Sequence, residues 1–98
     1  MAEINWTAEA EQWLKDIHDY IAQDNPEAAS RVINTIYAKV QLLKRFPELG
    51  YKYELQQKHN IRVLLLGRYR IAYIVKKDGN IDILGVFHGA LDIDHYQF

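Results

Sequence analysis

Three apolar segments separated by two short turns constrain the fold of this chain more than any other feature of its sequence. The segments are Ile61–Leu66, Tyr69–Lys76 and Ile81–His88. Between the first two, Gly67-Arg68 places glycine at the first central position of a two-residue loop, as a type II′ hairpin turn requires. Between the last two, Asp78-Gly79 lies at the centre of Lys77–Asn80 and is a strong hairpin signal. The sequence therefore predicts three antiparallel strands joined as a meander.

Two amphipathic helices are predicted before these strands. Thr7 is a suitable N-cap for the first helix, and Glu9 and Glu11 suit the positive end of its dipole. Asn25-Pro26 offers the cap and the first position of the second helix, which Pro47 ends. Apolar residues recur at helical spacing: Ala10, Trp13, Leu14, Ile17 and Ile21, then Ala29, Val32, Ile33, Ile36, Val40 and Leu43. Because the break between them is short, the two helices are expected to form an antiparallel hairpin.

The remaining segments complete one domain, which we expect to span residues 1–98. Ala2–Trp6 alternates apolar and polar residues, which predicts a short strand with one face inward. Pro47–Asn60 is polar without a clear period and is interpreted as a loop, and a short helical turn is expected within Gly89–Phe98. The element order is then β-α-α-β-β-β. We expect an α+β fold in which the helical hairpin packs on one face of an antiparallel sheet.

Composition excludes several classes of protein. The chain contains 49% hydrophobic and 26% charged residues, an ordinary globular balance. It has no cysteine, which excludes disulfides and thiolate chemistry, and no apolar run long enough to span a membrane. We therefore expect a cytoplasmic protein with no membrane partner. No glycine-rich phosphate loop or Ser-His-Asp arrangement is present, so no cofactor is expected. Asp92, Asp94 and His95 suggest a metal site, but a solvated acidic tail is the simpler interpretation, and no metal is expected.

The net charge of −1 conceals three segments of different charge. Residues 1–27 contain seven acids and one base, residues 31–77 eleven bases and two acids, and residues 78–98 four acids and no base. One interpretation is that the folded protein has distinct faces for different partners. The alternative is that folding interleaves the three segments and cancels the asymmetry.

The three later strands are predicted to divide their side chains between two faces. The face expected to meet the helices carries Val63, Leu65, Tyr69, Ile71, Tyr73, Val75, Ile81, Ile83, Gly85 and Phe87. The other face combines the apolar residues Leu64, Leu66, Ile74, Leu84 and Val86 with Arg62, Arg70 and His88. An uncovered apolar patch rimmed by charge is typical of a protein-binding site. We interpret this second face as a partner surface; the alternative is that the long loop and the C-terminal tail cover it.

An ordered set of short motifs resembles the RelE/ParE superfamily of type II toxin–antitoxin toxins. The motifs are Trp6-Thr7, Ala8–Gln23, Asp24-Asn25-Pro26 with Ala28-Ala29 and Val32, Phe46-Pro47-Glu48-Leu49-Gly50, Tyr69-Arg70-Ile71-Ala72-Tyr73 and Val86-Phe87-His88-Gly89-Ala90. The resemblance implies a cognate antitoxin whose disordered segment folds onto the toxin. The second sheet face would then bind it through Leu64, Leu66, Arg70, Ile74, Leu84, Val86 and His88.

The resemblance leaves two activities open. ParE-like members are described as poisons of DNA gyrase without catalysis, and RelE-like members as ribosome-dependent endoribonucleases. Several ParE-like members have an arginine directly after the final His-Gly-Ala, where this chain has Leu91, although apolar residues also occur there among ParE-like proteins. For a gyrase poison, the C-terminal residues Asp94, His95, Tyr96 and Phe98 are candidates for target binding.

The ribonuclease hypothesis requires a specific set of side chains. Metal-free RNA cleavage needs a base for the 2′-hydroxyl, an acid for the leaving oxygen and cations around the phosphate. Arg62, Arg70 and His88 are predicted on one sheet face, and Glu48 or Glu54 would approach from the loop. Arg70 and His88 would equally suit pairing with antitoxin carboxylates.

Charge favours the gyrase hypothesis. A protein that acts inside ribosomal RNA gains affinity by releasing counterions and is expected to be strongly basic, whereas this chain is mildly acidic. We therefore expect a ParE-like toxin that binds gyrase and contacts DNA only indirectly, through its antitoxin complex. A third hypothesis is a toxin relic that only binds its antitoxin and co-represses transcription with it.

Overall fold

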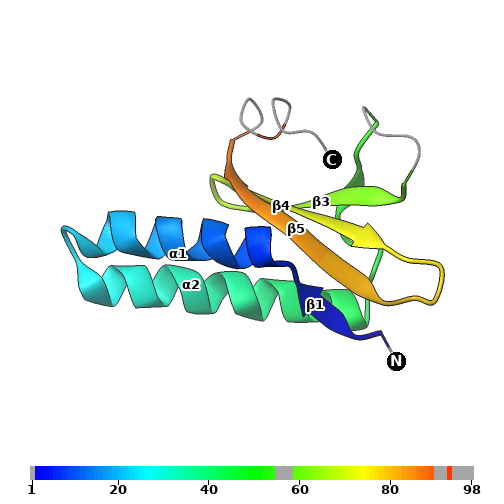
Figure 1. Ribbon diagram of the computed structural model, residues 1–98, viewed down its shortest axis with the longest axis horizontal. Coiled ribbons are helices and arrows are strands. Elements are labelled where there is room, and N and C mark those ends of the chain that lie inside the picture. Colours follow the sequence, from blue (N-terminus) through cyan, green and yellow to red (C-terminus); the bar gives the residue numbers. More distant parts are fainter. Residues whose placement is uncertain (1, 55–58, 90–92, 94–98) are drawn as a thin grey trace.

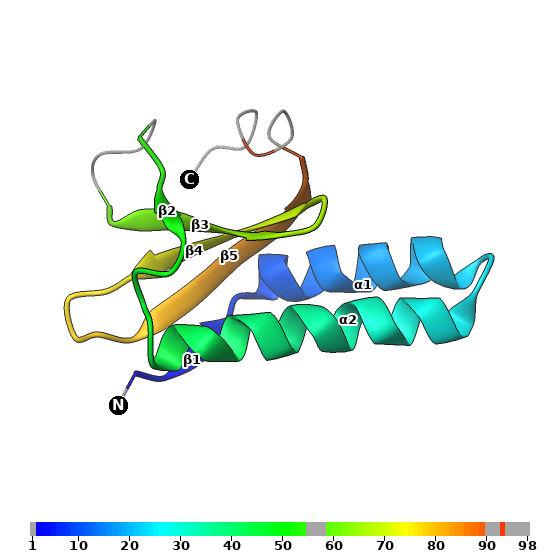
Figure 2. The ribbon, with the colours of Figure 1, turned by 180° about the vertical axis from the view of Figure 1, so that it is seen from behind.

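The computed structural model describes residues 2–54, 59–89 and 93. In chain order its elements are β1 (Ile4–Trp6), α1 (Ala8–Ala22), α2 (Pro26–Gln41), the 3-10 turn η1 (Leu42–Lys44), β2 (Tyr51–Lys52), β3 (Ile61–Leu66), β4 (Tyr69–Val75) and β5 (Ile81–His88). The strands form one sheet in the order β1-β5-β4-β3-β2. The two helices lie side by side on one face of this sheet, and their far end projects beyond it (Figure 1). Figure 2 shows the same arrangement from behind, and the predicted α+β fold is confirmed.

Both helices begin at the predicted residues. The Thr7 hydroxyl accepts a hydrogen bond from the Ala10 amide at 3.1 Å and donates one to the Ile83 carbonyl at 2.7 Å. The Asn25 side chain accepts from the Ala28 amide at 3.1 Å, and Pro26 occupies the first turn of α2. Thr7 therefore both caps α1 and attaches its first turn to β5. Among the described residues, neither helix is long and apolar enough to cross a bilayer.

The sheet contains two features that the sequence did not predict. β1 pairs with β5 in parallel, with Ile4 opposite Ile81, so the sheet is mixed rather than wholly antiparallel. β2 lies within the segment predicted to be a loop and pairs antiparallel with β3, with Tyr51 opposite Val63. A strand of two residues is too short to show a period in the sequence, which explains why it was missed.

The predicted side-chain directions of β3 are wrong. Leu66 pairs with Tyr69 across the two-residue turn, and Leu64 pairs with Ile71. Directly opposed residues on neighbouring strands point to the same face, so Leu64 and Leu66 face the helices and Val63 and Leu65 face away. The length of the turn already implied this register.

The predicted directions are also wrong in the second half of β5. The β4–β5 register shifts between Ala72 and Tyr73, which pair with Gly85 and Ile83. Leu84 is thus an extra residue in a β-bulge, and beyond it the alternation of β5 reverses. Val86 consequently faces the helices, whereas Phe87 shares the opposite face with its partner Arg70.

Hydrophobic clusters form on both sides of the sheet. The cluster beneath the helices contains Ala10, Leu14, Ile36, Val40, Leu43, Leu64, Ile71, Tyr73, Ile81, Ile83 and Val86. The cluster on the other side contains Tyr53, Ile61, Val63, Ala72, Phe87 and Ile93. The expectation of an uncovered second face is therefore wrong in large part, because Tyr53 from the loop and Ile93 from the tail are buried on it. We call this side the outer sheet face.

A tyrosine hydroxyl holds the segment after α2 against the sheet. Tyr73 is completely buried in β4, and its hydroxyl donates to the Pro47 carbonyl at 2.8 Å. The same oxygen accepts from the Gly50 amide at 2.9 Å. One side chain thus satisfies a backbone donor and a backbone acceptor that would otherwise be buried without partners.

Gly50 and Arg62 complete this attachment. A Cβ at Gly50 would lie 2.6 Å from the Val63 carbonyl oxygen and 2.9 Å from the Tyr73 ring, so only glycine fits there. Arg62 donates through Nη1 to the Gly50 carbonyl at 2.8 Å and to the Glu48 carbonyl at 3.4 Å. The Phe46–Gly50 segment is therefore fixed at several backbone atoms.

We predict that Tyr73→Phe lowers the free energy of unfolding by about 1–3 kcal/mol, because it removes the partner of two backbone groups at Pro47 and Gly50. Urea denaturation followed by circular dichroism measures this change. Tyr69→Phe on the same strand is the matched control and should alter stability by less than about 0.5 kcal/mol. Equal effects of the two substitutions would contradict the assignment.

We also predict a pH dependence from the same group. Burial is the main cause that raises the pKa of the Tyr73 hydroxyl above its ordinary value of 10.0. The unfolded chain therefore loses this proton first, and the contribution of Tyr73 is complete below pH 10 and declines as pH rises through the folded pKa. The free energy of unfolding should fall more steeply above pH 10 in the wild type than in Tyr73→Phe. Parallel pH profiles would rule this out.

Candidate functional site

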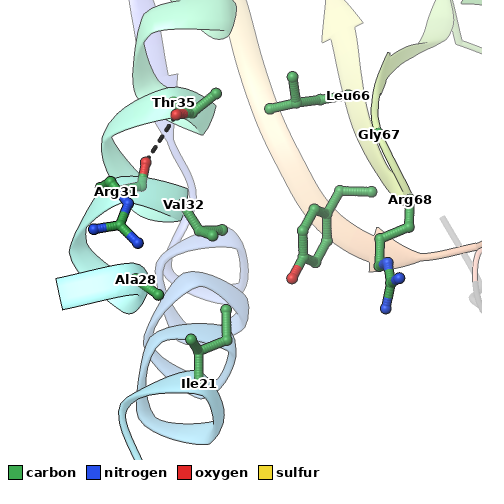
Figure 3. Close-up of a pocket in the computed structure, with 9 residues that line it drawn as sticks. Ile21, Ala28, Arg31, Val32, Thr35, Leu66, Gly67 and Arg68 are labelled. Carbon is green, nitrogen blue, oxygen red and sulfur yellow. Dashed lines mark hydrogen bonds between the residues drawn. The ribbon is translucent and has the colours of Figure 1, made fainter. Parts of the chain in front are cut away.

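A groove separates the far part of the helical hairpin from the β3–β4 turn (Figure 3). Its volume is about 700 Å³. One wall is helical, and the other is the tip of the hairpin between β3 and β4. The lining residues are Ile21, Ala28, Arg31, Val32, Thr35, Leu66, Gly67, Arg68 and Tyr69. The groove exists because the helical hairpin extends beyond the sheet that covers its other half.

The groove combines an apolar interior with two cations. Val32 and Leu66 are half-buried and face each other across the groove, whereas Arg31 and Arg68 are exposed. The Thr35 hydroxyl donates to the Arg31 carbonyl at 2.8 Å. Among the described residues, none that lines the groove is acidic, and neither arginine forms an ion pair. Such a groove fits a segment that carries apolar side chains and carboxylates.

Tyr69 and His88 continue this surface beyond the groove. They are paired across β4 and β5, and their rings lie edge to face with centroids 5.7 Å apart. His88 is exposed. Two of the residues predicted to bind an antitoxin, Leu66 and His88, therefore lie in or beside the groove.

The outer sheet face carries three other residues of that prediction. Arg70 is half-buried and donates through Nη1 to the Tyr51 hydroxyl at 3.0 Å. Ile74 and Leu84 are half-buried against the outer cluster. Leu65, which was predicted to face the helices, is 50% exposed here. The outer sheet face is thus a partly filled surface and not an open apolar sheet.

Leu64 and Val86, predicted on the same uncovered surface, are not accessible. Leu64 is 3% exposed and Val86 is fully buried, both in the cluster beneath the helices. The register of β3 and the bulge in β5 account for this placement. The prediction that these two residues lie on a partner surface is wrong.

The residues predicted for catalysis are not brought together. Arg62 pairs with Tyr73 and His88 with Tyr69, so both lie on the helix side of the sheet, four residues apart along β4. At ~3.3 Å per residue, the Cα atoms of their β4 partners, Tyr73 and Tyr69, are ~13 Å apart. Arg70 points to the opposite face, and the expectation that the three share one face is wrong. Glu48 is exposed, and its carbonyl accepts from Arg62; Glu54 is also exposed.

Some predicted residues lie outside the described part of the chain. Asp94, His95, Tyr96 and Phe98, the candidates for target binding, belong to this group, as do Leu91 and Asp92. Among the described residues, no group of three or more histidines and carboxylates is arranged to hold a metal ion.

Few ion pairs join the oppositely charged segments among the described residues. The ion pairs among the described residues are Lys15–Asp19 at 3.0 Å, His18–Asp19 at 3.3 Å and Lys76–Asp82 at 3.5 Å. Only the last joins the basic middle segment to an acidic one, and it involves neither arginine of the groove.

Comparison with known proteins identifies the family. Residues 4–93 match the model of the ParE toxin of the type II toxin–antitoxin system parDE. The chain belongs to the ParE toxin family. The toxin is also 34% identical over 85 residues to the Sinorhizobium fredii protein named "Putative toxin Y4kP", a match that covers 87% of this chain and 85% of the relative.

Two solved structures share the fold of the toxin. The chromosomal ParDE system from P. aeruginosa matches with a TM-score of 0.76 and 25% identity, over 92% of this chain and 98% of that chain. The toxin–antitoxin complex RelBE2 from Mycobacterium tuberculosis matches with a TM-score of 0.61 and 19% identity, over 89% and 96%. The resemblance to the RelE/ParE superfamily is confirmed.

The groove itself was not predicted from the sequence of the toxin. Ile21 and Val32 belong to the predicted apolar stripes and Gly67-Arg68 to the predicted turn, so each had a structural explanation already. The available signal was that Arg31 directly precedes a stripe residue while Arg68 occupies a hairpin tip. That signal becomes informative only once the tip is known to lie opposite α2.

Proposed function

We propose that this toxin inhibits DNA gyrase by protein–protein contact and that the cognate antitoxin that neutralises it is anchored in the groove. Inhibition by binding, rather than by catalysis, is supported by the placement of Arg62, Arg70 and His88 on both faces of the sheet. Membership of the ParE family supports the same target, because ParE-like toxins are those described as gyrase poisons.

The separation of these three side chains disfavours the ribonuclease alternative because of the geometry that RNA cleavage requires. A base, an acid and a cation must all reach one phosphodiester, within hydrogen-bond distance of the reacting atoms. Arg70 is bonded to Tyr51 on the outer sheet face, while His88 contacts Tyr69 on the other side. A single phosphate cannot contact both side chains through the sheet, which favours inhibition by binding.

The antitoxin is expected in the groove because its chemistry differs from that of the outer sheet face. Ile93 and Tyr53 are buried on the outer sheet face, whereas no described residue fills the groove between Val32 and Leu66. Arg31 and Arg68 at its rim would pair with carboxylates of the bound segment. A segment that folds on binding gains its affinity from such combined apolar and charged contacts.

We predict that the purified toxin abolishes supercoiling by gyrase and leaves mRNA intact in a translation extract. Replacing Arg70 and His88 together by alanine should retain most of the inhibition, because neither side chain is required to activate a nucleophile in this proposal. The measurement is the toxin concentration that halves supercoiling for the wild type and for the double variant.

Other outcomes of this assay have definite meanings. Codon-positioned mRNA cleavage that disappears in the Arg70 and His88 variant, with gyrase unaffected, would refute gyrase inhibition and establish the ribonuclease. Activity in neither assay would leave a relic that binds only its antitoxin.

We further predict that Arg31→Glu with Arg68→Glu weakens antitoxin binding by roughly tenfold or more, because two attractive rim contacts become repulsive. Isothermal titration with the antitoxin segment measures the affinity, and the wild-type value should fall as salt is raised. Lys77→Glu, an exposed charge reversal at the β4–β5 turn, is the control. Unchanged affinity in the double variant would place the antitoxin elsewhere.

A further inference from the structure

A second exposed apolar surface lies at the end of α2 opposite the groove. Phe46 is 56% exposed, Leu49 45% and Leu42 42%. Backbone hydrogen bonds link these three residues. The Phe46 amide donates to the Leu42 carbonyl at 2.9 Å, and the Leu49 amide donates to the Phe46 carbonyl at 3.0 Å. Large apolar side chains that are exposed together commonly mark an interaction site.

The backbone of this surface is held rigidly. Tyr73 bonds Pro47 and Gly50, and Arg62 bonds Gly50 and Glu48. The exposure of these side chains is therefore not the result of a loose loop. The fold fixes the backbone and leaves Phe46 and Leu49 pointing outward. A preorganised aromatic residue loses little conformational entropy on binding, which is the property of an interface anchor.

Unpaired cations border the same surface. Lys44 and Arg45 are exposed and form no ion pair within the described ranges, and Arg45 lines a hollow of about 490 Å³ with Phe46, Pro47, Glu48 and Leu49. Among the described residues that line this hollow, Glu48 alone carries a carboxylate. Apolar anchors beside arginine and lysine are complementary to a protein surface that offers an apolar pocket with acidic residues around it.

We propose that Phe46 and Leu49, together with Lys44 and Arg45, form the surface through which the toxin contacts its target protein. The occupant is an acidic protein surface with an apolar pocket; that it belongs to gyrase rests on the proposed function. A protein is favoured over duplex nucleic acid, because Phe46 and Leu49 offer apolar anchors that fit a protein pocket and make no use of a phosphate backbone.

The position of the surface separates it from the groove. From Arg31 to Leu42 the helix rises roughly 16 Å at 1.5 Å per residue, and Phe46 lies beyond η1. A partner bound only in the groove therefore leaves the Phe46–Leu49 surface uncovered. Target and antitoxin would use different residues of the toxin, and substitutions can test them independently.

The test is the Phe46→Ala/Leu49→Ala double variant in the gyrase supercoiling assay. We expect the half-inhibitory concentration to rise by about tenfold or more, as for loss of interface anchors. Lys44→Glu/Arg45→Glu should raise it as well, with a stronger effect at low salt. Tyr20→Ala, which removes a 68% exposed aromatic residue from α1, and Lys77→Glu are the matched controls and should behave as the wild type. Thermal unfolding and antitoxin binding verify that each variant is folded.

Each of the other outcomes either supports or overturns the proposed target surface. A folded double variant that inhibits gyrase as strongly as the wild type overturns it. If the wild type does not inhibit gyrase, the proposed function fails, and the inference is then tested by growth arrest of cells that express the toxin. Loss of growth arrest in the Phe46→Ala/Leu49→Ala variant supports the proposed surface. Growth arrest that persists in this variant overturns the inference. A wild-type toxin that neither inhibits gyrase nor arrests growth has no target, and this result also overturns the inference. A gel shift of DNA alone that the charge reversal abolishes would replace the protein target by nucleic acid.

Discussion

The Tyr73 hydroxyl is the interaction that fixes the chain leaving α2, and with it the Phe46–Leu49 surface, against the sheet. It joins the centre of the sheet to the chain that leaves α2, through Pro47 and Gly50. Burial of an unpaired backbone amide or carbonyl is unfavourable by about 1–3 kcal/mol, so this junction has one geometry and not several. This attachment holds the C-terminal end of α2, and the apolar cluster beneath the helices holds the part of the hairpin that covers the sheet. The N-terminal half of α2 projects past the sheet edge. The groove lies at the projecting end of α2, and the exposed Phe46 lies at the attached end.

Much of this fold could be predicted from the sequence because the decisive signals are local. Thr7 and Asn25-Pro26 specify helix starts by hydrogen bonds within one turn, and both caps are present in the structure. Gly67 has φ +57°, as the predicted turn requires, and the meander follows from it. The motifs of the RelE/ParE resemblance lie on these same elements, which explains why the family was recognised although each motif is short.

The candidate site was harder to predict because it depends on register and on distant contacts. One extra residue at Leu84 reverses the faces of Val86 and Phe87, and no period in the sequence announces a bulge. Gly85 leaves room for the Phe87 ring: a Cβ there would lie 2.8 Å from this ring, which contacts Trp13 with 4.9 Å between ring centroids. The predicted grouping of Arg62, Arg70 and His88 failed for this reason, together with the register of β3. Neither β2 nor the groove has a local signature, since both arise from segments far apart in the chain.

The separation of the two surfaces sets a condition on neutralisation. If the target contacts Phe46 and the antitoxin is anchored between α2 and the β3–β4 turn, binding in the groove alone does not block the target. An antitoxin that excludes the target must extend roughly 16 Å along α2, which an extended chain covers in about five residues at ~3.3 Å each. Alternatively, the body of the antitoxin must be large enough to obstruct the target while only its segment is bound. A peptide made of the groove-binding segment and the roughly five residues that follow it along α2 distinguishes these cases, because it silences the toxin if the extension excludes the target and leaves the toxin active if the body of the antitoxin is required.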